Sequence, residues 1–374
     1  MTKNSFILSP FSILLGGYYF FYFALVGVYV IFLPKTLIDL GYSTFDVGII
    51  YAAAPFMRFL LPFLFRHFVA LTPKIYLFSL LFTFVGALLF LGTATHFWLF
   101  LLANLLFGAA MGISLPYVET IALSTLSREY YGKVRLWGSL GFMFIALWLG
   151  KVLSLPYESL YYLSAMAFFT LIFGALLIGH DIKEHDTVND DSSFSLSKYW
   201  AFWLSIFLMQ LGFGGYYNFF TIYELSHGVS LEMTSWMWSF GVICEVVMLY
   251  YQGALLQRNL LNILQFATLI TALRWLLLYV YPESMTITFI SQSFHAISFA
   301  LYHTAAITYV FSLYTQKKLA QQFFLGIAFG LGGSLGALLS GQFYGEYLFL
   351  VEAGITFLAF IALLIHQNRR STIL

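Results

Sequence analysis

Charge is what this sequence has least of: Asp, Glu, Lys and Arg together make up 9% of its 374 residues, while 61% are hydrophobic and 21% aromatic. A soluble domain carries about 25% charged residues. The composition therefore excludes a soluble globular protein and predicts a polytopic protein embedded in a lipid bilayer. At roughly 20 residues per span, this length accommodates about twelve transmembrane helices.

Further absences narrow the function. The single cysteine, Cys244, excludes an internal disulfide framework and an all-cysteine metal site. A net charge of +1 without a basic tract argues against nucleic-acid binding. No zinc-protease HExxH motif, Walker loop or haem motif occurs, and His295 and His303 have no acid nearby in the sequence. We therefore expect no metal, no cofactor and no enzymatic activity.

What the sequence has in abundance is apolar runs bounded by charged residues, Pro or Gly, and these predict an all-α membrane protein. The one long polar stretch, 181–198, predicts a cytoplasmic linker between an N-terminal six-helix bundle (1–180) and a C-terminal six-helix bundle (199–374). The twelve predicted spans are 10–34, 44–65, 75–93, 97–123, 132–155, 159–179, 199–223, 233–256, 260–281, 285–313, 319–342 and 347–366.

The distribution of Lys and Arg predicts the orientation of the chain. If both termini are cytoplasmic, the outer loops hold only Lys35 and Lys151. The inner loops and tails then hold Lys3, Arg66, Lys74, Arg128, Lys133, Lys183, Lys198, Arg258, Lys317, Lys318, Arg369 and Arg370.

The first apolar run is about 25 residues long, which exceeds the length of a signal-peptide core. It therefore predicts an uncleaved first helix.

Charges inside the spans mark the candidate site. A lone charge at mid-depth costs at least ~2.5–3.5 kcal/mol, so such residues are expected to meet a partner, a substrate or water. Each half has a glutamate on one helix and an arginine on the next: Glu119 then Arg135, Glu245 then Arg274. With Arg58 in the second span, the cations outnumber these glutamates by one, which favours an anionic substrate. The alternative is that the pairs merely tie helices together.

Polar stripes and one outlying acid complete the sequence pattern. Glu352 falls near the outer end of the last span, where we expect it to be solvated at the interface. Two spans carry polar residues at helical spacing, which predicts a lined cavity, although tyrosine stripes are more often packing and a helical histidine is usually only hydrogen-bonded. The stripes are Gln210, Gly214, Tyr217, Thr221 and Glu224 beside Asn218, and Ser291, His295, Ser298 and Tyr302 beside His303.

One run, YGKVRLWGS (Tyr131–Ser139), resembles the junction of the fourth and fifth helices in the 3-phenylpropionate transporter family of the major facilitator superfamily. The resemblance extends over both halves. It implies twelve helices in the major facilitator fold, a monomer, and a bacterial inner membrane location. Further matches are MRFL around Arg58, Tyr216-Tyr217, Ile222-Tyr223, WSFGVICEV ending in Glu245-Val246, Leu273-Arg274-Trp275 and His303-Thr-Ala-Ala.

A more distant resemblance, to lactose permease, assigns roles to individual residues. The permease has Pro-x-x-Glu in its fourth helix, here Pro116 to Glu119, and Gly-basic-x-Arg opening its fifth, here Gly132 to Arg135. The likeness implies that Glu119 and Arg135 contact substrate, and that Glu245, Arg274 and His295 belong to proton coupling. The permease's acid three positions after the histidine is Ser298 here, and its sugar-stacking tryptophan is Phe142, which disfavours a galactoside.

These patterns predict a secondary active transporter that imports a small organic substrate, such as an aromatic monocarboxylate, together with protons. The alternatives are a sugar or nucleoside proton symporter, a proton-driven exporter, and, from another class, a membrane enzyme or sensor. The expected substrate-binding residues are Arg58, Glu119, Arg135, Phe142, Tyr217 and Asn218, and the expected proton-coupling residues are Glu245, Arg274, His295 and His303.

Overall fold

The computed structural model describes residues 9–67, 72–126, 128–155, 157–178 and 194–373, without the side chains of 62–67, 128–129, 318 and 370–373. Helices and short turns form this part of the chain, and no strand occurs in it. Internal contacts divide the chain into unit 1 (Met1–Asp186 and Leu231–Trp236) and unit 2 (Thr187–Ser230 and Met237–Leu374). Most of the predicted linker, 181–198, lies outside the described residues.

Unit 1 begins with a helix whose start follows from local chemistry. The Ser9 side chain accepts a hydrogen bond from the Ser12 amide at 3.2 Å, and Pro10 suits the first turn because it needs no amide donor. Thr72 and Pro73 start the fourth helix in the same way. The helices are α1 (Pro10–Gly27), η1 (Val28–Phe32), α2 (Leu33–Asp39), α3 (Thr44–His67), α4 (Pro73–Thr93), α5 (Phe97–Thr125), α6 (Arg128–Val152) and α7 (Glu158–Ala175).

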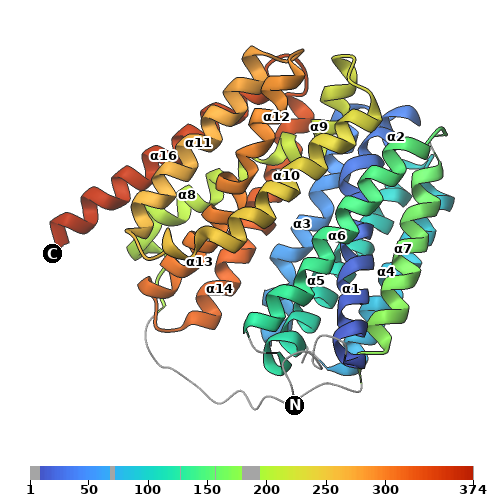
Figure 1. The fold of residues 1–374 in the computed structure, drawn as a ribbon, viewed down its shortest axis with the longest axis horizontal. Helices are drawn as coiled ribbons and strands as arrows, with labels where there is room; N and C mark the ends of the chain where they lie inside the picture. Colours follow the sequence, from blue (N-terminus) through green and yellow to red (C-terminus); the bar gives the residue numbers. More distant parts are fainter. Residues whose placement is uncertain (1–8, 68–71, 127, 156, 179–193, 374) are drawn as a thin grey trace. The chain divides into compact units, whose positions relative to one another are not determined.

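Glycines let the helices of unit 1 approach closely. α1 packs against α6 and α7, α4 against α5 and α7, and α3 against α5 (Figure 1). A Cβ on Gly141 would lie 2.0 Å from the carbonyl oxygen of Phe20, so α6 reaches α1 only because this residue has no side chain. Gly108 does the same for α5 against Ala54 of α3, where a Cβ would lie 2.4 Å from the Cα atom.

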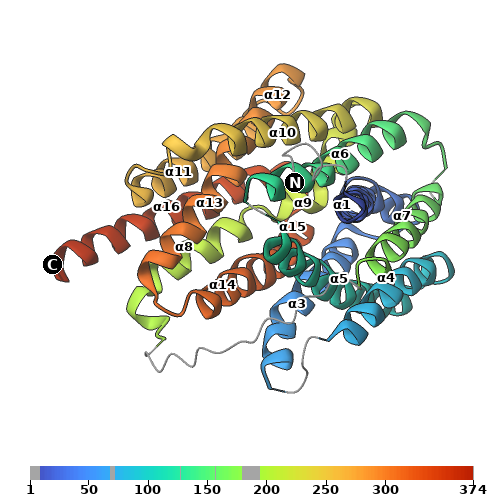
Figure 2. The same cartoon turned by 60° about the horizontal axis from the view of Figure 1, so that its bottom comes forward.

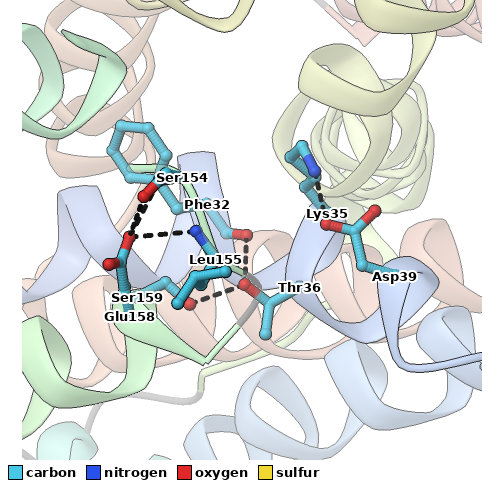
Figure 3. Close-up of polar contacts among 8 residues, drawn as sticks. All are labelled: Phe32, Lys35, Thr36, Asp39, Ser154, Leu155, Glu158 and Ser159. Carbon is cyan, nitrogen blue, oxygen red and sulfur yellow. Dashed lines mark hydrogen bonds and ion pairs between the residues drawn. The ribbon is translucent and has the colours of Figure 1, made fainter. Parts of the chain in front are cut away.

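Polar contacts tie α2 to α7 at one end of unit 1 (Figure 3). The Thr36 and Ser159 hydroxyl oxygens lie 2.6 Å apart, and both residues are buried. The Glu158 carboxylate accepts hydrogen bonds from two backbone amides of the preceding loop, at 2.8 and 3.0 Å, which fixes the start of α7. Lys35 and Asp39 form an ion pair one turn apart on α2.

Unit 2 repeats the packing order of unit 1. In both, the first span contacts the fifth and sixth, and the third contacts the fourth and sixth; in unit 2 the pairs include α8 with α16, α9 with α15, α11 with α13, and α11 with α16 (Figures 1 and 2). The remaining elements, of which only the first six residues of α10 belong to unit 1, are η3 (Ser197–Tyr199), α8 (Trp200–Leu211), α9 (Gly214–Ser226), α10 (Leu231–Tyr251), η4 (Gln252–Ala254), α11 (Leu260–Val280), α12 (Met285–Ser293), η5 (Ala296–Leu301), α13 (Tyr302–Leu313), α14 (Lys317–Leu325), η6 (Gly326–Gly332), α15 (Gly333–Gln342) and α16 (Leu348–Ile373).

Ten described helices are long and apolar enough to cross a membrane, compared with the twelve spans that the sequence predicts. The predicted span 199–223 is interrupted at Gly212 and Phe213, so neither α8 nor α9 reaches full length. The predicted span 132–155 belongs to α6, whose first two turns include the charged residues Lys133 and Arg135. The first of these two spans is therefore missing because its helix is broken, and the second because charged residues lower the hydropathy of its helix.

Three spans contain a π-helical segment, which is common at functional sites. η5 follows His295 directly, and η6 occupies the glycine-rich run Gly326–Gly332. The hydrogen bonds of such segments are rearranged, so the side chains beyond them change direction relative to a regular helix. The charged and polar residues of the tenth span are therefore placed by a distorted helix.

Candidate functional site

In unit 1, Glu119 of α5 and Arg135 of α6 lie together, as their sequence spacing predicts. The Arg135 Nε atom is 3.1 Å from Glu119 Oε1, and the Tyr131 hydroxyl donates a hydrogen bond to Glu119 Oε2. The Arg135 and Glu119 side chains are 31% and 22% exposed. The carboxylate is therefore held by two donors while both charged groups stay accessible.

Aromatic rings of α1 support this arginine. The guanidinium carbon of Arg135 lies 4.1 Å from the Phe23 ring centroid and 5.2 Å from the Tyr19 centroid. Cation–π contacts of this kind are worth about 0.5–1 kcal/mol at exposed sites and more when desolvated. They orient the planar guanidinium without consuming its hydrogen-bond donors.

Arg58 of α3 belongs to the same group of charges. Its side chain is exposed and runs along α5, where a Cβ on Gly112 would lie 3.4 Å from Arg58 Cγ. Arg58, Arg135 and Glu119 all lie close enough to the buried Tyr22 hydroxyl to interact with it electrostatically. Two cations and one anion therefore converge near one face of α1.

In unit 2, Arg274 of α11 is fully buried and surrounded by neutral groups. It donates hydrogen bonds to His295 Nδ1 at 3.1 Å, Ser298 Oγ at 3.0 Å and Gln292 Oε1 at 3.1 Å. Its guanidinium carbon lies 4.2 Å from the Tyr216 ring centroid and 4.5 Å from that of Trp275. Hydrogen bonds and ring faces thus replace the water that a buried charge loses.

His295 lies between Arg274 and Glu245. Arginine can only donate, so the His295 Nδ1 atom must accept and the ring proton is on Nε2. The Nε2 atom faces Glu245 Oε2 at 3.6 Å. A second proton on the ring would have to replace the Arg274 hydrogen bond. Protonation of His295 and the position of Arg274 are therefore mutually dependent.

A ladder of rings continues from His295 to the second predicted histidine. Phe299 lies parallel to His295, with centroids 5.2 Å apart, and His303 lies 6.1 Å beyond Phe299. His303 is half-buried between Phe324 and Phe329, and Glu245 is close enough to act on it electrostatically. Both histidines thus lie within electrostatic range of one glutamate.

The three other predicted substrate residues lie apart from these hydrogen bonds. Tyr217 stacks on Phe213 with centroids 5.4 Å apart, although Arg274 and Glu245 both lie within electrostatic range of it. Asn218 donates its side-chain amide to the Gly214 carbonyl of its own helix at 2.7 Å. Phe142 is half-buried two turns beyond Arg135 and packs towards α1 at Gly27.

Glu245, Arg274 and His295, which the sequence groups as proton-coupling residues, lie together, with His295 between the glutamate and the arginine. One expectation about an acid is wrong. The sequence predicts a solvated Glu352, whereas this side chain is 2% exposed and lies within electrostatic range of Arg274. Periodicity along one helix cannot reveal which neighbouring helix lies closest, and this explains the error.

Sequence reasoning also missed partners that the structure reveals. Tyr216 lies under Arg274 and donates to Gln292 Oε1 at 2.8 Å, while the prediction chose its neighbour Tyr217. Gln292 lies three residues before His295, and this spacing places both side chains on the same face of a helix. The sequence alone could therefore have indicated Gln292. Tyr131 and Phe23 had no such signal. Among the described residues, no group of three or more His, Cys, Asp or Glu forms a metal site.

The family of the chain follows from its match to known proteins. Residues 12–359 match the model of the MFS_1 like family, so the chain belongs to that family. It is an all-α membrane protein and a transporter of the major facilitator type, not an enzyme. Each unit also has a cluster of charged residues within its membrane spans, partly exposed in unit 1 and buried around Arg274 in unit 2.

Individual relatives agree with this assignment. The chain is 26% identical over 362 residues to the probable 3-phenylpropionic acid transporter of Escherichia coli (strain K12), covering 90% of this chain and 92% of that protein. Its fold is similar to a mutant of the nucleoside transporter NupG, with a TM-score of 0.78, 18% identity and coverage of 96% and 100%. The human organic anion transporter MFSD10 gives a TM-score of 0.66 at 15% identity, covering 95% and 100%.

Proposed function

We propose that this transporter imports a small organic anion, such as an aromatic monocarboxylate, together with protons. The observation that carries the proposal is the accessible Arg135, which is paired with Glu119 and supported by Phe23 and Tyr19. The relative from E. coli, which is named for 3-phenylpropionic acid, supports the same substrate class.

The guanidinium geometry explains how a carboxylate binds in this proposal. Glu119 uses the Nε side of Arg135, and the two Nη groups form the other edge of the planar fork. That edge matches the two oxygens of a carboxylate and gives two parallel hydrogen bonds. The half-buried Phe23 offers part of its ring to the aromatic part of the substrate, and the exposed Arg58 adds a second positive charge.

The proposed proton-coupling group is Glu245 with His295 and Arg274. A second proton on His295 alters what Arg274 binds, because Nδ1 accepts from that arginine only while it is unprotonated, and Glu245 beside Nε2 stabilises the imidazolium that forms. His303 belongs to the same group because it lies within electrostatic range of Glu245, although the Phe299 ring separates it from His295. The driving force is ample, because each charge that crosses 100 mV is worth ~2.3 kcal/mol.

Several properties of the whole protein belong to the same proposal. We propose that 1–180 and 199–374 act as two bundles joined by a cytoplasmic linker at 181–198. The Lys and Arg distribution supports cytoplasmic termini. The bacterial relative supports a location in the bacterial inner membrane. A monomeric transporter is part of the same proposal.

Uptake into liposomes tests this proposal. The purified full-length protein is reconstituted and given labelled 3-phenylpropionate, a nucleoside or a neutral sugar, with and without an acidic exterior. We expect the labelled carboxylate to accumulate only when the exterior is acidified. Accumulation of the nucleoside or sugar instead would overturn the substrate class, and uptake that ignores the pH gradient would overturn proton coupling.

A further inference from the structure

Glu352 of α16 is a buried carboxyl group that the proposed function does not use. Its Oε1 atom accepts hydrogen bonds from the Gly215 amide and from the Ser340 hydroxyl, the latter at 3.3 Å. Its Oε2 atom has no hydrogen-bond partner among the described residues, and the side chain is 2% exposed. An ionised oxygen that is buried without a partner is costly, and a proton on Oε2 removes that charge.

The helix break in the seventh span creates the pocket for this carboxyl group. α9 starts at Gly214, and its first amides have no partner within the helix, so they point towards Glu352. A Cβ on Gly215 would lie 2.6 Å from Glu352 Oε1, so only glycine allows this approach. The partial positive charge of the helix N-terminus favours the ionised carboxylate, while burial favours the protonated acid.

The cation that can change this balance is Arg274. It lies on α11, which packs against α16, and its charge acts on Glu352. From α9, Tyr216 faces the carboxyl group through its backbone amide, and the sequences of α8 and α15 contain no titratable residue. In the described structure the Arg274 Nε atom, like Glu352 Oε2, has no hydrogen-bond partner. One donor and one acceptor are thus both unused.

We propose that Glu352 is a second proton-binding site of the transport cycle, and that Arg274 alternates between His295 and Glu352. While Arg274 donates to His295, Ser298 and Gln292, the Glu352 Oε2 atom keeps a proton. When Arg274 leaves His295, the O–H bond of Glu352 breaks, the proton passes to water, and the electron pair stays on Oε2 as a carboxylate that pairs with Arg274 Nε. This inference rests on the proposed proton coupling.

A small cavity borders the Glu352 carboxyl group. It measures about 10 Å³, which is close to the least that one water molecule needs, and it lies against Glu352, Ser340 and Leu211. Its other walls are apolar side chains, so Glu352 and Ser340 are the polar residues that line it.

Infrared difference spectroscopy on the purified full-length protein tests proton binding without any transport. A pH step should change the carbonyl stretch of a protonated carboxyl group. We expect Glu352→Gln to lose this band and Ser340→Ala, the matched control, to keep it, because the control removes a donor but leaves the carboxyl group. An unchanged band in Glu352→Gln overturns the proposal. If that variant does not fold, Glu352→Asp should shift the band, and an unshifted band has the same meaning.

Liposome assays connect the proton to transport. We expect Glu352→Gln to exchange substrate across the membrane but to equalise the two concentrations under a pH gradient that makes the wild type accumulate it. Wild-type accumulation that persists in Glu352→Gln overturns the role of Glu352 and leaves the proposed function intact. If the wild type itself ignores the pH gradient, proton coupling fails, while the infrared band still decides whether Glu352 binds a proton. A requirement for Na⁺ in place of the pH gradient also overturns this inference.

Discussion

Replacing Arg135 by lysine tests whether the arginine fork binds the substrate carboxylate. Lysine keeps the positive charge but has one nitrogen, which cannot contact Glu119 and also offer two parallel donors. The loss of one charge-assisted hydrogen bond costs about 1.5–3 kcal/mol. The weaker contact with Phe23, now 4.1 Å from the guanidinium carbon, adds about 0.5–1 kcal/mol.

The Arg135 side chain is 31% exposed, so solvent screens part of each interaction. We therefore expect an effect near the lower end of the range of about 1.5–3 kcal/mol for the hydrogen bond. We predict that Arg135→Lys weakens monocarboxylate binding by at least ~1.5 kcal/mol, or roughly tenfold in Kd. Isothermal titration of the purified protein measures this change. Arg369→Lys, the same substitution outside the cluster at the end of α16, is the matched control and should bind like the wild type.

An unchanged Kd in a folded Arg135→Lys protein would refute this reasoning. The pair of Glu119 and Arg135 would then have only the structural role of joining α5 to α6. A loss of affinity that also appears in Arg369→Lys would point to a general effect of lysine and would equally remove the assignment.

Three further predictions follow from particular contacts. Because Arg58 and Arg135 lie near a single acid, a carboxylic acid should bind more tightly than its neutral amide, and equal binding in titration would contradict an anionic substrate. Glu245→Gln, which mimics the protonated acid, should retain substrate exchange in liposomes but lose accumulation driven by an acidic exterior; retained accumulation would make His295 the next residue to test. Asn104→Leu leaves the Ile50 carbonyl without its donor at 2.5 Å and should destabilise the protein by about 1–3 kcal/mol, seen as a lower unfolding temperature, with substrate affinity unchanged.

The sequence was sufficient for the elements that depend on local chemistry. Long apolar runs predicted most of the spans, because a bilayer requires about 20 apolar residues in each helix. Glu119 and Arg135 were predicted as neighbours because a short loop joins their two helices, and they do meet at 3.1 Å. A charge in an apolar run is expensive, so its presence alone identifies a residue that needs a partner.

The sequence was insufficient wherever the answer depends on distances between helices. Nothing in the spacing of Glu245 and Arg274 indicates that His295 lies between them, because α10, α11 and the tenth span are brought together only by packing. Glu352 was misplaced for a related reason: the break at Gly212 redirects the amides of α9 towards it. Helical periodicity assumes an unbroken helix, and it fails where the helix is interrupted.

The two arginines differ in a way that suits two different tasks. Arg135 pairs directly with a carboxylate and stays partly exposed. An anion from solution can therefore reach it without a conformational change that exposes a buried charge. Arg274 is fully buried, and its hydrogen bonds go to His295, Ser298 and Gln292, all of which are neutral in the observed arrangement. The loss of one partner from a buried ion pair costs several kcal/mol. A buried cation that is held by neutral groups can change its hydrogen-bond partners without this cost. The position of Arg274 should therefore respond to a single proton on Glu245, His295 or Glu352, which is the property that a proton-coupled cycle needs.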